Sequence, residues 1–212
     1  MLDLNPEQRE LVLDLSYRLQ HKIETPFHIF IENSGGSGKS QLIPALYYYC
    51  SYLINHLPIS SISDDNIVLK VAPTGVAAVN VEGATIHTAF HIPITTTSTA
   101  VITRRHYYAN NFNRHRQHLL AVQLLIIDEI SAVSDILFSE IDNILRELHN
   151  PIQPFGGISV IIIGDLYQLP PPSGRMIYET GSICPDLWQL FTRYYLIINM
   201  RQETVPDFFN VL

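Results

Sequence analysis

The chain has 212 residues, 47% of them hydrophobic and 16% charged, a balance typical of a globular protein that excludes a disordered one. A chain of this length buries enough apolar surface to fold as one domain. Its longest apolar runs, such as Ile158–Ile163, are far shorter than the roughly 20 residues that a membrane-spanning helix needs. The first residues, MLDLNPEQREL, lack the basic head and apolar core of a secretory signal. Cys50 and Cys184 match no metal spacing and indicate reduced, buried thiols in an intracellular protein.

The net charge of −7 disfavours a nucleic-acid partner, because phosphate binding favours a basic surface. The basic residues are nevertheless unevenly distributed. Between Thr103 and Leu119 lie Arg104, Arg105, Arg114 and Arg116, together with His106, His115 and His118. This stretch is either a phosphate-binding patch or a solvated loop, and charge alone favours the solvated loop.

The first third of the chain alternates between helical and strand-like segments. Leu4–Ile23 predicts an amphipathic helix with Asn5 as N-cap and Pro6 at the first helical position. A strand follows at Phe27–Glu32, then a glycine-rich turn and a helix over Lys39–Leu53. A second strand at Ile67–Ala72 leads through Pro73-Thr74-Gly75 into another helix.

Three further apolar runs, Gln123–Ile127, Ser159–Ile163 and Tyr194–Ile198, predict strands in the rest of the chain. Continuous apolar strands that alternate with helices indicate a buried parallel sheet with helices on both faces, and hence the α/β class. Ligands bind at the carboxyl ends of such strands, where Asp128 and Asp165 stand. The region of about 92–118, which is Thr-rich and then basic, looks like an excursion from this core.

The run Asn33–Ser40, NSGGSGKS, lies between a strand and a helix, where a phosphate-binding loop belongs. Glycines let backbone N–H groups turn toward phosphate oxygens, and the helix adds its positive N-terminus. Lys39 is placed to reach the β- and γ-phosphates, and Ser40 offers a hydroxyl to Mg²⁺. Asn33 replaces the usual first glycine, and asparagine tolerates left-handed backbone angles better than other residues do. The residues that would form the loop are Gly35, Gly36, Ser37, Gly38, Lys39 and Ser40.

Two acidic residues follow the apolar strand in LLIIDEIS, Leu124–Ser131. Such a pair can divide the work, with Asp128 holding Mg²⁺ and Glu129 orienting and activating the attacking water. An Asp-Glu pair after a strand is weak evidence alone, but together with GSGKS upstream it indicates an ATP-hydrolysing P-loop NTPase.

The segment IGDLYQLPP, Ile163–Pro171, places Gln168 just past another strand. Gln168 could hydrogen-bond the γ-phosphate or its attacking water. Alternatively the segment is a structural turn set by Pro170 and Pro171, and its spacing leaves both interpretations open.

These residues resemble the PIF-one family of superfamily-one DNA helicases. The resemblance rests on ordered blocks that span nearly the whole chain: LNPEQ, GGSGKS, VAPTGVAAVNVEGATIHTAF (Val71–Phe90), LLIIDEIS, GDLYQLPP and NMRQ (Asn199–Gln202). The third block is the most diagnostic, because generic ATPases lack it. It is also similar to the helicase segments of Helitron-type mobile elements.

The resemblance implies a role for individual residues. Gln8 would read the adenine edge, Gln168 would couple the γ-phosphate to the DNA track, and Arg201 would reach the γ-phosphate. Lys39, Glu129, Gln168 and Arg201 would thus be the catalytic set, with Mg²⁺ on Ser40 and Asp128. Single-stranded DNA would contact Thr74, Gly75, Thr85 and His87, although His87 in an apolar setting reads without the resemblance as a core histidine.

The resemblance also implies a RecA-like P-loop fold and an ATP-dependent 5′-to-3′ DNA helicase in repair, recombination and telomere maintenance, nuclear or mitochondrial. Residues 1–212 correspond to the first RecA-like motor domain, and the second such domain of the family has no counterpart in this sequence. We therefore expect nucleotide binding but no unaided unwinding. The alternatives are a non-catalytic nucleotide- or DNA-binding remnant of a helicase or mobile element, and a nucleotide kinase.

Overall fold

A parallel sheet with helices on both faces forms the core of the computed structural model, which confirms the predicted α/β class. The structure describes residues 4–21, 26–33, 38–56, 67–93, 113–179 and 181–198. The helices in these ranges are α1 (Pro6–His21), α2 (Lys39–His56), α3 (Gly75–Asn80), α4 (Ile86–Ala89), α5 (Asn113–Ala121), α6 (Asp135–Leu148) and α7 (Pro185–Gln189). The strands are β1 (His28–Asn33), β2 (Val68–Ala72), β3 (Ala84–Thr85), β4 (Leu124–Ile127), β5 (Ser159–Gly164) and β6 (Thr192–Leu196). Two short 3₁₀ turns lie at Ile130–Ala132 and Pro154–Gly157.

The strands run in the order β3-β2-β4-β5-β1-β6, and every pair is parallel. The five strands predicted from apolar runs are all present. The prediction for the last of them was shifted, because β6 begins at Thr192 and ends at Leu196 rather than covering Tyr194–Ile198. Its first residues, Thr192 and Arg193, are polar and exposed on an edge strand, so an apolar run could not reveal them.

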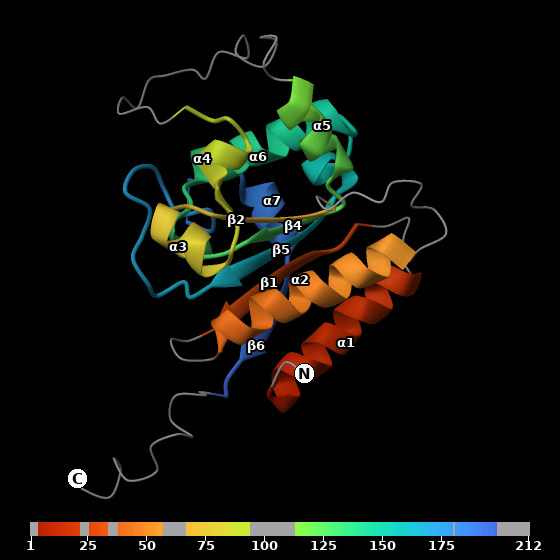
Figure 1. Cartoon of the computed structure of the whole chain (residues 1–212). Coiled ribbons are helices and arrows are strands. Elements are labelled where there is room, and N and C mark those ends of the chain that lie inside the picture. The colour runs from red at the N-terminus through yellow and green to blue at the C-terminus, as the bar shows by residue number, and fades with distance from the viewer. Residues whose placement is uncertain are drawn as a thin grey trace, which may run out of the picture.

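Helices cover both faces of the sheet (Figure 1). Helices α1 and α2 lie side by side on one face, with Leu15 and Leu46 packed beneath them against the strands. Helices α6 and α7 lie on the other face, where Phe138 of α6 and Leu187 of α7 share one hydrophobic core with Phe30 of β1. The same strands serve both layers because successive side chains of a strand point to opposite faces. This double burial is the reason that the strands read as continuous apolar runs.

Both cysteines are free and buried, as predicted. Burial raises the pKa of the Cys50 thiol to about 12, so this thiol stays protonated and unreactive. Within the described ranges, no helix combines the length and the apolar character that crossing a bilayer requires.

Asp135, at the start of α6, anchors the loop that follows β5. Its Oδ1 accepts hydrogen bonds from the backbone N–H groups of Ile136 (2.8 Å) and Arg175 (3.3 Å). Its Oδ2 accepts from the N–H of Ile183 at 3.2 Å. One buried carboxylate thus satisfies donors from the middle and from the end of the loop, which holds this loop against the start of α6.

His28 opens β1 in an aromatic environment. Its ring lies 5.3 Å from that of Phe155 and 5.5 Å from that of Phe191, measured between centroids. Its Nε2 is buried without a hydrogen-bond partner. Burial is the main reason that the pKa of His28 falls to about 4. The folded protein therefore holds this imidazole neutral.

The pKa of His28 predicts an acid-sensitive stability. Between pH 6.5 and pH 4 the unfolded chain binds the proton and the folded chain does not, so stability falls as the pH falls through this window and levels off below it. We expect His28 to account for a loss of at most about 3 kcal/mol. Urea unfolding at several pH values should show this loss in the wild type and a smaller one in His28→Phe. Parallel curves for the two proteins would contradict the prediction.

Candidate nucleotide-binding site

The carboxyl ends of all strands meet at one edge of the sheet, because every strand runs in the same direction. Strand β5, which leads to Gln168, lies between β1, which leads to the phosphate loop, and β4, which leads to Asp128 and Glu129. The sheet order therefore collects on adjacent strands three motifs that are far apart in sequence. The predicted DNA residues follow β2 and β3, farther along the same edge.

The phosphate loop enters α2 through Gly38, whose φ of +80° lies in the region that favours glycine. The Gly38 carbonyl accepts hydrogen bonds from the N–H groups of Gln41 (3.0 Å) and Leu42 (3.1 Å). Lys39 and Ser40 are the first residues of α2, at the end of the helix that attracts anions. Gly35, Gly36 and Ser37 lie outside the described residues.

Asn33 is the last residue of β1 and pairs in register with Leu196 of β6. Its backbone is extended, so this position does not use the left-handed angles that the sequence pattern suggested for asparagine. The departure from glycine thus falls in the strand, before the loop turns.

An ion pair joins the phosphate loop to the acidic motif. Lys39 Nζ donates a hydrogen bond to Glu129 Oε1 at 3.1 Å, and both side chains are partly exposed. A pair at this level of exposure contributes little to stability, so the ammonium can exchange one anionic partner for another at low cost. The contact places the predicted phosphate-binding cation beside the predicted water-activating carboxylate.

The backbone of Glu129 is left-handed, with φ 52° and ψ 48°. For a residue with a Cβ this conformation costs roughly 1–2 kcal/mol, and such strain gathers at functional sites. The turn that follows passes close to β5, where a Cβ on Gly164 would lie 3.0 Å from the backbone N of Ile130. Glycine at 164 thus allows β5 to approach this turn. Gly164 of the segment IGDLYQLPP therefore has a packing role that sequence analysis missed.

Asp128 carries the clearest sign of a metal site. Its side chain is buried, and its Oδ1 has no hydrogen-bond partner. Burial raises the pKa of Asp128, although the Lys39 charge and the Glu129 backbone N–H lower it in part. A buried, unpartnered carboxylate oxygen is costly, and a hard cation is the partner that would satisfy it.

Among the described residues, no group of three or more His, Cys, Asp or Glu side chains could hold a metal ion alone. This donor set still fits Mg²⁺, which usually takes one or two carboxylates and completes its shell with water and substrate phosphates. Ser40 is exposed on the first turn of α2, and its role as a metal ligand stays a prediction.

Gln168 lies in a tight turn at the end of β5. The turn is closed by hydrogen bonds from the N–H of Gln168 to the Asp165 carbonyl (3.1 Å) and from the N–H of Tyr167 to Asp165 Oδ1 (3.0 Å). Gln168 is half-buried. The structural turn is therefore real, and the catalytic role of Gln168 stays a prediction beside it.

Gln8 is fully buried, and its amide bonds within the protein. Its Oε1 accepts from the N–H of Asn5 (3.1 Å) while Asn5 Oδ1 accepts from the N–H of Gln8 (2.9 Å), which forms a reciprocal capping box. Its Nε2 donates to the Gly38 carbonyl at 3.2 Å. Sequence analysis found the N-cap but missed this reciprocity, which the Asn5-to-Gln8 spacing signals. Adenine contact by Gln8 stays a prediction and would require one of these bonds to be exchanged.

The predicted DNA residues lie at the starts of two short helices, at the carboxyl ends of β2 and β3. Thr74 is the N-cap of α3, and Thr85 is the N-cap of α4. Gly75 is exposed, with open space where a Cβ would stand. Burial lowers the pKa of His87, so at neutral pH its ring offers a hydrogen bond rather than a charge.

Two predicted features fall wholly or partly outside the described residues. Arg201 and the NMRQ block lie beyond residue 198. Of the basic stretch, the structure describes exposed Arg116 and His118 on α5, while Arg104 and Arg105 lie outside.

A parallel α/β sheet with a phosphate loop, a buried Asp128 and a paired Glu129 at one edge defines a P-loop NTPase domain of the RecA-like type. The chain matches the family model described as PIF1-like helicase over residues 3–207. It belongs to the PIF1-like helicase family.

Proteins with similar sequences or structures are named as PIF1-type DNA helicases. The chain is 27% identical over 204 residues to the ATP-dependent DNA helicase PIF1 of Emericella nidulans, and the match covers 95% of this chain and 26% of the relative. It is 37% identical over 169 residues to the helicase PIF6 of Trypanosoma brucei, which covers 74% of this chain and 19% of that one. The crystal structure of a Bacteroides Pif1 helicase with ADP-AlF3 and ssDNA superposes with a TM-score of 0.68 at 30% identity, covering all of this chain and 46% of that one. This chain thus spans about a quarter or less of these two curated relatives.

Replacement of Asp128 by its neutral isostere should have opposite effects on stability and on metal use. Because the surroundings of Asp128 as a whole disfavour its charge, we expect Asp128→Asn to raise the melting temperature of the nucleotide-free protein by about 2 °C. The same variant should lose the gain in nucleotide affinity that Mg²⁺ confers.

Scanning calorimetry and nucleotide titrations with and without Mg²⁺ would measure both effects. Asp165→Asn is the matched control, since an amide oxygen can still accept the turn hydrogen bond from Tyr167. A lower melting temperature for Asp128→Asn, with Mg²⁺ dependence intact, would refute the assignment.

Proposed function

We propose that this chain is the ATP-binding RecA-like motor domain of a PIF1-type DNA helicase, which couples ATP hydrolysis to 5′-to-3′ movement along single-stranded DNA. The main support is the buried, unpartnered Asp128 beside the Lys39–Glu129 pair, at the edge where the phosphate loop enters α2. The printed names of the relatives support the helicase assignment, and residues 1–212 stand for one motor domain of proteins several times longer.

In this proposal, Lys39 and the first N–H groups of α2 hold the phosphates, while Ser40 and Asp128 hold Mg²⁺. The metal would neutralise phosphate charge when bound. Glu129 orients the attacking water, and its position 3.1 Å from Lys39 places its carboxylate near the γ-phosphate position. Gln168 and Arg201 complete the catalytic set, and Gly35, Gly36 and Ser37 the loop.

Single-stranded DNA would cross the same edge of the sheet at Thr74, Gly75, Thr85 and His87. The short helices capped by Thr74 and Thr85 leave exposed surface at this edge, and DNA backbone can be held there without a large basic patch. This arrangement is consistent with the acidic net charge of −7. The free, buried cysteines support an intracellular location, which we propose to be nuclear or mitochondrial.

A non-catalytic nucleotide- or DNA-binding module is the second candidate, since a remnant could keep these motifs without turnover. The strained backbone of Glu129 favours an active parent, because a module that only binds nucleotide has no use for this strain. Tight Mg·ATP binding with negligible DNA-stimulated turnover by the wild-type chain would favour the module.

Removal of the proposed phosphate-binding lysine should weaken nucleotide binding. Lys39→Ala deletes a charge-assisted contact, and we expect Mg·ATP affinity to fall about 10- to 100-fold. Glu129→Gln keeps the shape of the side chain and should retain Mg·ATP binding while it loses hydrolysis. Isothermal titration and a phosphate-release assay with and without single-stranded DNA would measure these effects.

Two results would contradict this scheme. Phosphotransfer to a small acceptor without any DNA effect would identify a nucleotide kinase. ATP-driven unwinding by the purified chain, lost in Lys39→Ala, would show that one motor domain is sufficient, against our expectation.

Substitutions at Thr74 can separate helix capping from DNA contact. Its Oγ1 accepts from the N–H of Ala77 at 3.2 Å, and Asn and Asp side chains can accept the same bond. Thr74→Asp would repel DNA phosphate and should weaken single-stranded DNA binding about tenfold, whereas Thr74→Asn should stay within about twofold of the wild type. Fluorescence polarisation at fixed salt would measure both, and equal affinities for the two variants would remove Thr74 from the DNA path.

A further inference from the structure

The first turn of α1 touches two separate parts of the nucleotide-binding edge through neighbouring residues. Gln8 reaches the phosphate loop by its hydrogen bond to the Gly38 carbonyl. Glu7 reaches the end of β6, where its Oε2 accepts from the N–H groups of Ile197 (2.9 Å) and Ile198 (3.1 Å). The capping box and the roles proposed above leave these contacts of Glu7 unexplained.

Within the part of the chain that the structure describes, the end of β6 has few other restraints. Among the strands of the described residues, β6 is an edge strand that pairs only with β1, and this pairing ends at Leu196. Ile197 is 78% exposed, so side-chain packing does not hold it. The carboxylate of Glu7 therefore supplies the hydrogen bonds that direct the chain as it leaves the sheet. Hydrogen bonds to a charged group are the stronger kind, and two consecutive donors on one oxygen fix a direction as well as a position.

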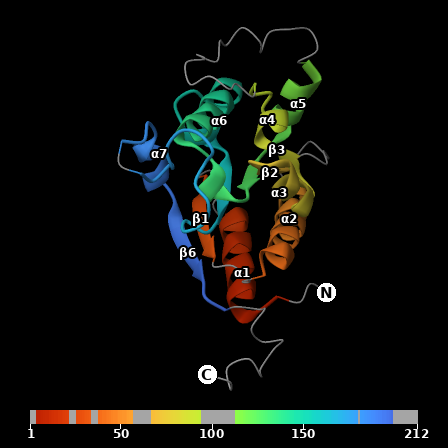
Figure 2. The same ribbon diagram turned by 90° about the vertical axis from the view of Figure 1, so that its left-hand side faces the viewer.

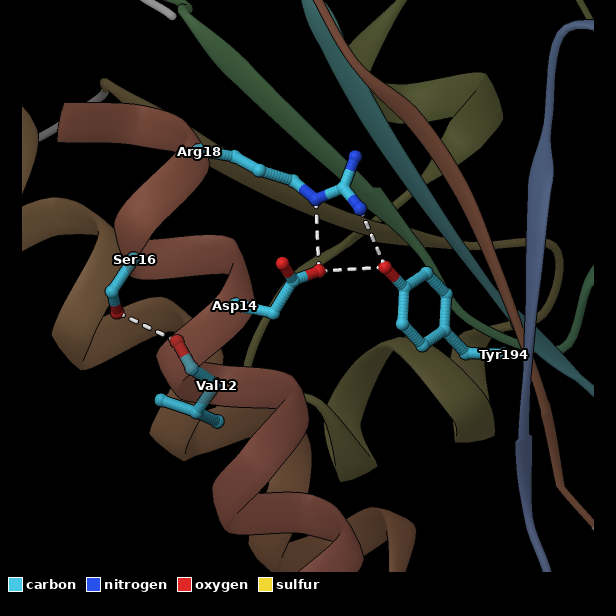
Figure 3. Close-up of polar contacts among 5 residues, drawn as sticks. All are labelled: Val12, Asp14, Ser16, Arg18 and Tyr194. Carbon is cyan, nitrogen blue, oxygen red and sulfur yellow. Dashed lines mark hydrogen bonds and ion pairs between the residues drawn. The ribbon is translucent and has the colours of Figure 1, made fainter. Parts of the chain in front are cut away.

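A second contact holds the middle of β6 against the same helix (Figure 3). Tyr194 donates from its hydroxyl to Asp14 Oδ2 at 2.6 Å and accepts from Arg18 Nη2 at 2.8 Å. Arg18 Nε also donates to Asp14 Oδ2 at 2.8 Å. Figure 2 shows β6 alongside α1, in agreement with these contacts. Tyr194 thus secures the strand, and Glu7 directs its exit.

We propose that Glu7 is a positioning residue of the nucleotide site, which fixes the exit of β6 relative to the phosphate loop and so sets the preference for ATP over ADP. The link is α1 itself, since Gln8 ties the same turn to Gly38. The next residues along the chain, Asn199–Gln202, contain Arg201, the predicted γ-phosphate contact. This inference rests on the proposed function, because it assumes that nucleotide binds at the phosphate loop.

The test compares the affinities of the whole chain for Mg·ADP and for the slowly hydrolysed analogue Mg·ATPγS. In Glu7→Ala, Mg·ADP affinity should stay within about twofold of the wild type, while the preference for Mg·ATPγS should fall about tenfold, the equivalent of roughly 1.4 kcal/mol. Glu7→Gln should show an intermediate loss, because its amide oxygen still accepts from Ile197 and Ile198 without a full charge.

Two controls separate positioning from general stability. Glu10→Ala removes the same charge from an exposed position on α1 and should leave the preference unchanged. Tyr194→Phe removes the mid-strand hydrogen bonds and should lower the melting temperature without changing the preference. A merely structural role for Glu7 would make its variants behave like Tyr194→Phe.

Amide exchange of Ile197 and Ile198 gives an independent measurement, and both amides should exchange faster in Glu7→Ala than in Glu10→Ala. If the wild type binds neither nucleotide, the proposed function fails and this inference with it. If the wild type binds both and Glu7→Ala keeps the wild-type preference or the slow exchange, the inference alone is overturned.

Discussion

The uniformly parallel pairing of the sheet is the constraint on which the nucleotide site depends. Parallel strands bring all their carboxyl ends to one edge, and the order β4-β5-β1 makes neighbours of the acidic motif, the Gln168 turn and the phosphate loop. Lys39 and Glu129 are 90 residues apart in sequence, yet their side chains meet at 3.1 Å. The helices on both faces exclude water from the strands. Water therefore does not compete for the backbone hydrogen bonds that fix the register of the sheet.

The site is costly to the fold in ways that point to function. Asp128 keeps an oxygen without a partner in a buried place, and Glu129 holds a left-handed backbone that a residue with a Cβ adopts reluctantly. Gly164 supports this arrangement, since a side chain at that position would press on the turn after Glu129. The fold thus loses stability where a cation and a developing charge need preorganised partners. Asp135 is equally buried, but both of its carboxylate oxygens accept backbone hydrogen bonds, so it serves the fold.

The sequence was sufficient for the fold class, for the five longer strands and for the helix that begins at Lys39, because apolar runs and glycine spacing report local chemistry directly. It was insufficient for β3, whose two residues are too short to show a period, and for the start of β6, which is polar on an edge. The left-handed Glu129 and the close approach at Gly164 depend on contacts between strands distant in sequence, so no local pattern could reveal them. At Asn33 the motif pattern was misleading. The pattern assigned this residue to the phosphate loop, but β1 continues through it.

Helix α1 shows why a motif can carry more than one meaning. In LNPEQ the spacing of Asn5 and Gln8 predicts a helix start, and the structure adds that Gln8 reaches Gly38 while Glu7 reaches the end of β6. Successive residues of a helix point about 100° apart, so two neighbours such as Glu7 and Gln8 can contact two different partners where the helix packs between those partners. The start of α1 lies in such a place. A helix that covers one face of the sheet therefore also sets the distance between the phosphate loop and the chain that leaves β6, and the geometry of the nucleotide site depends on how α1 begins.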